Sequence, residues 1–292
     1  MVHALTTHAV DIVLAALLLV GGTVYMAFAS HCDREPFHGW ILGYDAATMR
    51  QSVVYNDTVN GDSGGIWQSG MGLSADASGD IYYASGNGTF DPMASPPQLG
   101  NSAVRLRRSG ATLAVVDWFT PFNQSTLSEQ DYDFGSTGVE LLPGTSLALV
   151  GSKQGRLYLF RRDQMGHFNM AGDTQIVQSF LATANEEFSN IHGAPVFWSS
   201  PSGTLAYVWG ESDRLKAYRF DGSRFTTTPA FTSEVMAGEG MPGGMLAVSS
   251  NGSAAGSGVV WASIPIDRDA NMMTVPGVLR AFDASDVTRE IW

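Results

Sequence analysis

The chain has 292 residues, of which 44% are hydrophobic, 15% are charged and 33 are glycine. This composition is typical of a globular protein that can bury a sizeable core between many turns. A formal net charge of −12 and a pI near 4.7 argue against nucleic acid as a partner. The single cysteine, Cys32, excludes a disulfide within the chain and leaves the redox compartment open.

The first apolar segment, residues 12–30, is 19 residues long and ends in Ala-Phe-Ala-Ser, which is similar to a signal-peptidase site. No Lys or Arg precedes it, Asp11 borders it, and Gly21-Gly22 interrupts it, all of which disfavour a signal or a membrane anchor. The runs on either side of the glycine pair predict two buried strands joined by a tight turn. We therefore expect no membrane span here, and a signal or anchor segment is the alternative.

The rest of the chain repeats one pattern of short strands rich in Val, Ile, Tyr, Phe and Trp, with almost no helical periodicity. Each repeat has an apolar pair that closes a strand just before an Asp or Arg turn. These anchors lie at Tyr44, Leu106, Phe160, Phe220 and Phe282, and they are 62, 54, 60 and 62 residues apart. Such spacing fits four strands with generous loops in each repeat.

Each anchor has the same surroundings: a glycine-rich loop, an inner strand, a second strand, the anchor strand and an outer strand. The repeats run over residues 12–57, 65–120, 133–182, 193–233 and 243–292. They predict an all-β fold, a β-propeller of four-stranded antiparallel blades with about five blades in one domain, residues 1–292. The first repeat begins inside a strand and the last stops on its final aromatic residue, so we expect part of a larger propeller of seven or eight blades.

Two stretches of this pattern resemble a known family. Residues 37–49 resemble the repeat of the quinoprotein (pyrroloquinoline quinone, PQQ) dehydrogenases, in which a strand ends in Ala-Tyr-Asp before a Thr-Gly turn. Residues 79–91 resemble the strand end Ile-Tyr-x-x-x-Gly-Asn of the same family. The resemblance implies an eight-bladed propeller that holds the quinone in its central channel over a calcium ion, with an Asp as catalytic base.

The resemblance also implies positions for the calcium ligands. The family's ligand Asn falls on Asn87, and its ligand Glu falls near Asp33 or Glu35. Carboxylate and amide oxygens are ligands that Ca²⁺ prefers. Asp33 also lies near His31 and His38, and hydrogen bonding to loop backbone explains this group better than a transition-metal site.

The catalytic base has no clear counterpart. Its region aligns with residues 99–102, where Asn101 cannot act as a general base. The loop Gln130-Asp131-Tyr132-Asp133 resembles the family's Trp-Asp-Tyr-Asp loop and is interpreted mainly as a turn. The candidates for contact with a cofactor at the channel mouth are Trp67, Asp133 and His192.

Two functions remain open at this point. The first is a propeller scaffold with a degenerate quinoprotein site that binds a small molecule or a protein at its channel face. The alternative is an oxidoreductase, a PQQ- and calcium-dependent dehydrogenase of alcohols or sugars, which needs a base near Asn87 such as Asp62, Asp131 or Asp133. A lyase or hydrolase built on the propeller would need paired carboxylates in the channel. The resemblance implies a periplasmic or secreted protein.

Overall fold

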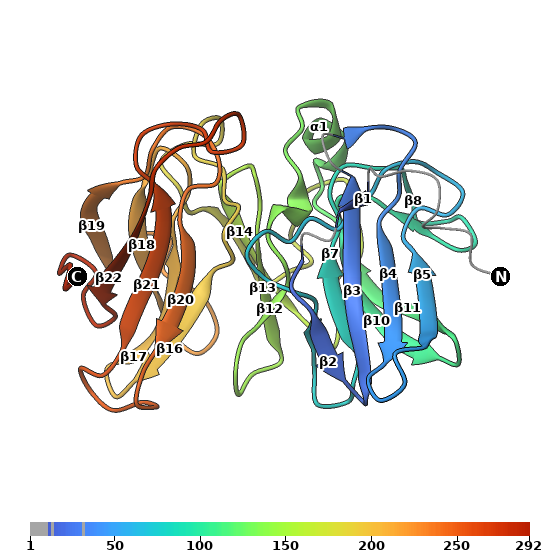
Figure 1. Cartoon of the computed structure of the whole chain (residues 1–292), viewed down its shortest axis with the longest axis horizontal. Helices are drawn as coiled ribbons and strands as arrows, with labels where there is room; N and C mark the ends of the chain where they lie inside the picture. Colours follow the sequence, from blue (N-terminus) through green and yellow to red (C-terminus); the bar gives the residue numbers. More distant parts are fainter. Residues whose placement is uncertain (1–10, 13–14, 31–32) are drawn as a thin grey trace.

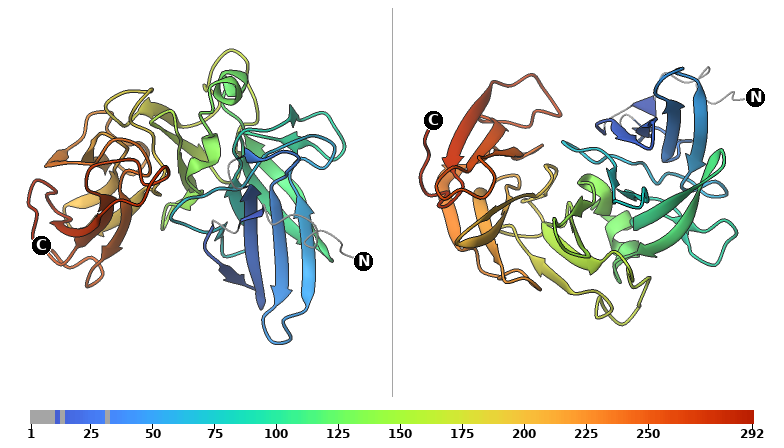
Figure 2. Two further views of the ribbon diagram at one scale, coloured as in Figure 1. Left: turned by 45° about the horizontal axis from the view of Figure 1, so that its top comes forward. Right: turned by 90° about the horizontal axis from the view of Figure 1, so that it is seen from below.

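The computed structural model describes residues 11–12, 15–30 and 33–292, and these residues form β-sheets (labelled in Figure 1) that are arranged along an arc. In Figure 2 the N-terminal and C-terminal sheets lie at the two ends of this arc, with a gap between them. The sheets are antiparallel within each repeat, as expected for the blades of a partial propeller. The predicted fold class is confirmed, whereas the assignment of residues 1–292 to one domain stays a prediction.

The first repeat forms an antiparallel sheet whose inner edge is a hairpin. The strands are β1 (Asp11–Ile12), β2 (Leu18–Val20), β3 (Thr23–Ser30), β4 (Trp40–Asp45) and β5 (Gln51–Asn56). Strand β2 pairs with β3 through a turn at Gly21 and Gly22, whose φ angles of 56° and 72° favour glycine. The predicted hairpin is therefore confirmed for its described part, and no helix among the described residues is long and apolar enough to cross a membrane.

The expectation that both hairpin strands are buried was wrong for the first one. Leu17 and Leu19 are 63% and 67% exposed, whereas Leu18 and Val20 pack on the core. Successive side chains of a strand point to opposite faces, and no other sheet of the described residues covers the second face of β2. The apolar run thus has an exposed side at the free end of the arc.

The second repeat pairs with the first, which the sequence pattern did not predict. Its strands are β6 (Ser74–Ala75), β7 (Ile81–Ala84), β10 (Ala103–Ser109) and β11 (Thr112–Phe119), and a small hairpin of β8 (Phe90–Asp91) and β9 (Gln98–Leu99) projects between them. The outer strands β11 and β5 form a parallel bridge between Thr112 and Val54, which joins the two blades into one nine-stranded sheet.

A short helical connection leads to the third and fourth sheets. It contains α1 (Gln124–Glu129) and the 3-10 turn η2 (Phe134–Ser136). The third sheet consists of β12 (Glu140–Leu141), β13 (Leu147–Gly151), β14 (Arg156–Arg161) and β15 (Gln178–Leu181). The fourth consists of β16 (Val196–Ser200), β17 (Gly203–Val208), β18 (Arg214–Phe220) and β19 (Phe231–Met236).

The fifth sheet has three strands, β20 (Met245–Ser249), β21 (Val259–Pro265) and β22 (Gly277–Asp283), instead of the predicted four. The C-terminal segment still follows β22, because the N–H of Ile291 donates to the carbonyl of Ala281 at 2.8 Å and the N–H of Ala281 donates to Trp292 at 2.7 Å. The fourth strand of this repeat is therefore reduced to a few hydrogen bonds at the edge.

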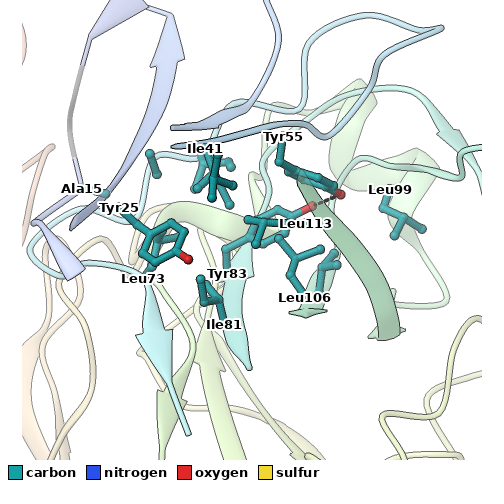
Figure 3. Packing of buried hydrophobic residues seen from close by; sticks show 14 residues of the cluster. Ala15, Tyr25, Ile41, Tyr55, Leu73, Ile81, Tyr83, Leu99, Leu106 and Leu113 are labelled. Carbon is teal, nitrogen blue, oxygen red and sulfur yellow. Dashed lines mark hydrogen bonds between the residues drawn. The ribbon is translucent and has the colours of Figure 1, made fainter. Parts of the chain in front are cut away.

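The hydrophobic core lies between neighbouring sheets, so that each strand buries alternate residues on opposite sides. On β7, Ile81 and Tyr83 enter the core shared with the first sheet, and Tyr82 and Ala84 enter the core shared with the third. Figure 3 shows the first of these cores. The packing of sheet faces against each other is what fixes the order of the blades.

A buried polar chain lies within the first core. The Tyr55 hydroxyl donates to the Tyr83 hydroxyl at 3.0 Å, and the Tyr83 hydroxyl donates to the carboxylate of Asp57 (Figure 3 shows the two tyrosines). The second carboxylate oxygen of Asp57 is buried without a hydrogen-bond partner. Burial raises the pKa of Asp57 to about 7, although the hydrogen bond from Tyr83 opposes the shift.

Candidate functional site

Loops of the second and third repeats and the connection between them bring a group of polar side chains together at one end of the sheets. We call the group of Asn87, Asn101, Asp131, Asp133 and Lys153 the polar cluster. Asn87 follows β7, Asn101 precedes β10, Asp131 and Asp133 lie between α1 and η2, and Lys153 follows β13. The members come from positions up to 66 residues apart in the sequence (87 to 153), so the fold has to assemble them.

Asp133 is the centre of the polar cluster. One of its carboxylate oxygens, Oδ1, accepts a hydrogen bond from the backbone N–H of Asn87 at 2.8 Å. The other, Oδ2, lies 2.6 Å from the ammonium Nζ of Lys153. The side chains of Asp133 and Lys153 are only 7% and 11% exposed, so this ion pair is largely shielded from solvent.

Asn87 extends the network on both sides. Its side-chain NH₂ donates to Asp131 Oδ1 at 2.7 Å, and its Oδ1 accepts from the side-chain NH₂ of Asn101 at 3.0 Å. Asn101 in turn accepts from the backbone N–H of Phe134 at 3.0 Å, and its φ of 54° is one that Asn tolerates better than most residues. Asn87 is thus held from several directions.

Gly86 allows Trp67 to approach the polar cluster. A Cβ on Gly86 would overlap Asp133 Oδ1 and would lie 2.8 Å from Cδ1 of the Trp67 ring. Only a glycine leaves room for the carboxylate and the indole at this position. Trp67 itself is half-buried, and the residue before it lies in the first core.

The charges of the polar cluster act on one another and on Asp33. Partial burial and the charges of Asp133 and Asp131 raise the pKa of Asp33 to about 6, against the opposing effect of Lys153. Burial alone would lower the pKa of Lys153, but the charges of Asp133 and Asp131 and their hydrogen bonds outweigh it, so the pKa is raised. Lys153 is therefore fully protonated at neutral pH.

The structure unites some of the residues singled out from the sequence and separates others. Asn87 and Asp133 are hydrogen-bonded, Trp67 lies against the same glycine as Asp133, and Asp33 is close enough for its pKa to respond to the polar cluster. Glu35 is exposed and takes no part in the hydrogen bonds of the polar cluster. The metal and cofactor roles predicted for all six residues stay predictions.

His192 belongs to a different pair. Its Nε2 lies 2.6 Å from Glu211 Oε1, and both side chains are more than nine-tenths buried. Gly193, the next residue, packs against the backbone of Gly244 in the loop before the fifth sheet. His38 makes a loop hydrogen bond, 3.0 Å from its Nδ1 to Thr58 Oγ1, with a side-chain hydroxyl and not with the backbone group expected for it, whereas His31 lies outside the described residues.

Sequence reasoning missed Lys153. It stands in a short loop between the apolar runs 147–150 and 157–160 and is one of only two lysines in the chain, which is a signal that could have drawn attention to it. The sequence analysis also interpreted the loop that contains Asp131 mainly as a turn. The residue does lie in a turn, with φ at 55°, yet its carboxylate joins Asn87 and Lys153, the latter at 3.2 Å.

Two cavities lie away from the polar cluster. One, of about 450 Å³, lies between β5 and β11 and is lined by Tyr55, Trp118 and His167 among others. The second, of about 300 Å³, lies between the third and fourth sheets next to Phe197 and Phe220. No residue of the polar cluster lines either of them.

Comparison with solved structures places the fold. A quinohemoprotein alcohol dehydrogenase from Pseudomonas putida HK5 matches with a TM-score of 0.50 and 14% identity, over 95% of this chain and 51% of that chain. This chain has the propeller fold of the quinoprotein dehydrogenases. A europium-containing methanol dehydrogenase also matches, with a TM-score of 0.51 and 13% identity, over 97% of this chain and 61% of that one.

The likeness concerns the fold, and this chain spans 51% and 61% of the lengths of those two proteins. No protein-family model matches the sequence, and no curated protein does either. The resemblance drawn from residues 37–49 and 79–91 is therefore confirmed for the fold, and the chemistry has to be argued from the residues themselves.

The quinoprotein resemblance implies a calcium ion, and the polar cluster does not fit one. Ca²⁺ takes about six to eight oxygen ligands. Here Asn87 Oδ1 accepts from Asn101, and both oxygens of Asp133 are already engaged, one of them by the Lys153 ammonium. Among the residues that the structure describes, no three His, Cys, Asp or Glu side chains are grouped so that they could hold a metal ion.

Proposed function

We propose that this protein is a ligand-binding propeller scaffold that has the quinoprotein fold and a degenerate quinoprotein site. The observation that supports it is the closure of the polar cluster. No buried side-chain N or O atom of Asn87, Asn101, Asp133 or Lys153 lacks a hydrogen-bond partner, and every partner is supplied by the protein. Since a half-satisfied network would be costly, a closed one is a stable arrangement that needs neither metal nor quinone.

The exposed charges of this region favour a cationic ligand. Asp131 is 67% exposed and Asp33 is also exposed, whereas the ammonium of Lys153 is largely covered. The ligand at the channel face would then carry an amine or guanidinium group, either as a small molecule or as a basic segment of a protein. The −12 net charge of the chain would attract such a ligand over a longer range.

A calorimetric titration with PQQ, with and without Ca²⁺, tests this proposal on folded and monodisperse protein. We expect no heat of binding in either condition, and the same result for Asn87→Ala. A parallel titration with a short oligoarginine peptide should show binding that weakens with salt and with Asp131→Asn. Calcium-dependent binding of PQQ that Asn87→Ala abolishes would refute the scaffold proposal.

One observation favours the second candidate, a PQQ-dependent oxidoreductase. The base that the sequence did not identify could be Asp33, because its pKa of about 6 suits a group that accepts a proton near neutral pH. Reduction of an artificial electron acceptor by an alcohol or a sugar, in the presence of PQQ and Ca²⁺, would support this candidate. For both candidate functions we propose that the protein lies in the periplasm or outside the cell, and cell fractionation tests this location.

A further inference from the structure

Lys153 occupies the centre of the negative charge in the polar cluster. Its ammonium lies 2.6 Å from Asp133 Oδ2 and 3.2 Å from Asp131 Oδ2, so it bridges two carboxylates. Its backbone N–H also donates to the carbonyl of Asp133 at 3.1 Å. This backbone hydrogen bond holds the main chain of Lys153 against the loop that carries both carboxylates.

The chemistry of this position is that of a bound cation. Two carboxylates lie at hydrogen-bond distance from one positive charge, and the side-chain NH₂ of Asn87 donates to one of them, Asp131. Hard divalent cations prefer the same oxygen groups. A divalent ion and the ammonium cannot share this space, because both need the same carboxylate oxygens and their charges repel.

We propose, building on the scaffold function above, that the Lys153 ammonium takes the place of a divalent cation in this site and is the residue that excludes metal from it. The lysine neutralises the carboxylates from within the chain and completes their hydrogen bonds. Its removal leaves Asp131 Oδ2 and Asp133 Oδ2, the two oxygens that it contacts, with free lone pairs at a partly buried position. A site for Ca²⁺ or a lanthanide ion then opens.

Lys153→Met tests the proposal, because methionine keeps an unbranched side chain of similar length and removes the charge. Terbium luminescence, excited through the tryptophans, and calcium calorimetry are measured on the wild-type protein, on Lys153→Met and on the double variant Lys153→Met/Asp133→Asn. We expect the wild type not to bind Ca²⁺ up to millimolar concentration. Lys153→Met should bind Ca²⁺ with a Kd at least ~10-fold below that limit, and the double variant should lose this gain in affinity.

The outcomes separate this inference from the proposed function. If a folded Lys153→Met binds Ca²⁺ no better than the wild type, the inference is wrong and the scaffold proposal stands. If the wild type itself binds Ca²⁺ together with PQQ, the scaffold proposal fails as well. Lys153→Gln serves as a second variant where Lys153→Met does not fold.

A measurement on the unaltered protein gives an independent answer. Only two lysines occur in the chain, so acetylation by acetic anhydride followed by mass spectrometry reports on each of them. Lys216, which lies 2.5 Å from Asp213, is the internal control. We expect Lys153 to react slowly and at the same rate with and without Ca²⁺; a Ca²⁺-induced rise in its rate relative to Lys216 would mean that metal displaces the ammonium and would overturn the inference.

Discussion

The buried carboxyl group of Asp57 makes the stability of the fold depend on pH. Burial raises its pKa from 3.8 to about 7, so the folded state retains a proton that the unfolded chain has released. The contribution of Asp57 to stability is therefore complete below about pH 4, falls as the pH rises through about 7, and is constant above that. Between about pH 5 and pH 8, linkage predicts a loss of about 2–3 kcal/mol in the free energy of unfolding from this one group.

Asp57→Asn isolates this effect. Asparagine keeps the oxygen that accepts the Tyr83 hydroxyl and cannot ionise, so its stability should vary less with pH. Urea unfolding followed by tryptophan fluorescence, on both proteins at several pH values between about 5 and 8, gives the difference between them. Other raised groups such as Glu140, whose burial raises its pKa to about 7, occur in both proteins and cancel from that difference.

The result that refutes the reasoning is a difference between the two proteins that stays constant over this pH range. The carboxyl group would then ionise with the same pKa in the folded and unfolded chains. Tyr83→Phe provides a further check. Loss of the hydroxyl that donates to Asp57 removes one of the bonds that favour the charged form, so the pH dependence should move to higher pH.

Three further perturbations follow from packing. Gly86→Ala should lower the free energy of unfolding, measured with urea, by about 2–3 kcal/mol, because the added Cβ overlaps a carboxylate oxygen of Asp133. Gly277→Ala is the control and should change this free energy far less, since the nearest atom to its Cβ is a carbonyl oxygen at 3.6 Å. Equal effects of the two substitutions would contradict this reasoning. Trp209→Ala should cost about 3–5 kcal/mol, because this side chain is 1% exposed between the fourth and fifth sheets, and the 67% exposed Trp292 serves as the control. Leu19→Lys should reduce self-association of the chain in size-exclusion chromatography, since Leu19 is 67% exposed at the end of the arc. If the wild type self-associates and the variant elutes at the same volume, this face is not the cause of the association.

The fold class was predictable because it depends on local patterns that recur. The anchor residues all lie in strands or at their ends, and the two-residue alternation on β7 already separates the two cores that Tyr82 and Tyr83 enter. The parallel bridge between Val54 and Thr112 was not predictable, because it depends on how two blades lean on each other. The exposure of Leu19 likewise depends on whether another sheet covers that face.

The candidate site was predictable only in part for a similar reason. Asn87 and Asp133 were found through short motifs that sit at strand ends, and loops at the same end of neighbouring blades meet in space. Lys153 carries no motif, and its role arises only when the third sheet places it beside Asp133. A pairing between loops of different repeats leaves no periodic trace in the sequence, so the member that decides the chemistry was the one that was missed.

The two candidate functions make opposite demands on the carboxylates near Lys153. A catalytic base must be deprotonated and free to accept a proton, but Asp133 and Asp131 are both held by the lysine ammonium. These ion pairs leave out Asp33, whose raised pKa suits a base, and Asp62, and we take Asp33 as the first candidate for the base of an oxidoreductase built on this site. Any PQQ-dependent turnover should then fall at least ~10²-fold in Asp33→Asn, the range expected for loss of a general base, and fall less in Asp131→Asn. Turnover that survives Asp33→Asn would place the base elsewhere, whereas ligand binding without turnover in both variants is what a scaffold requires.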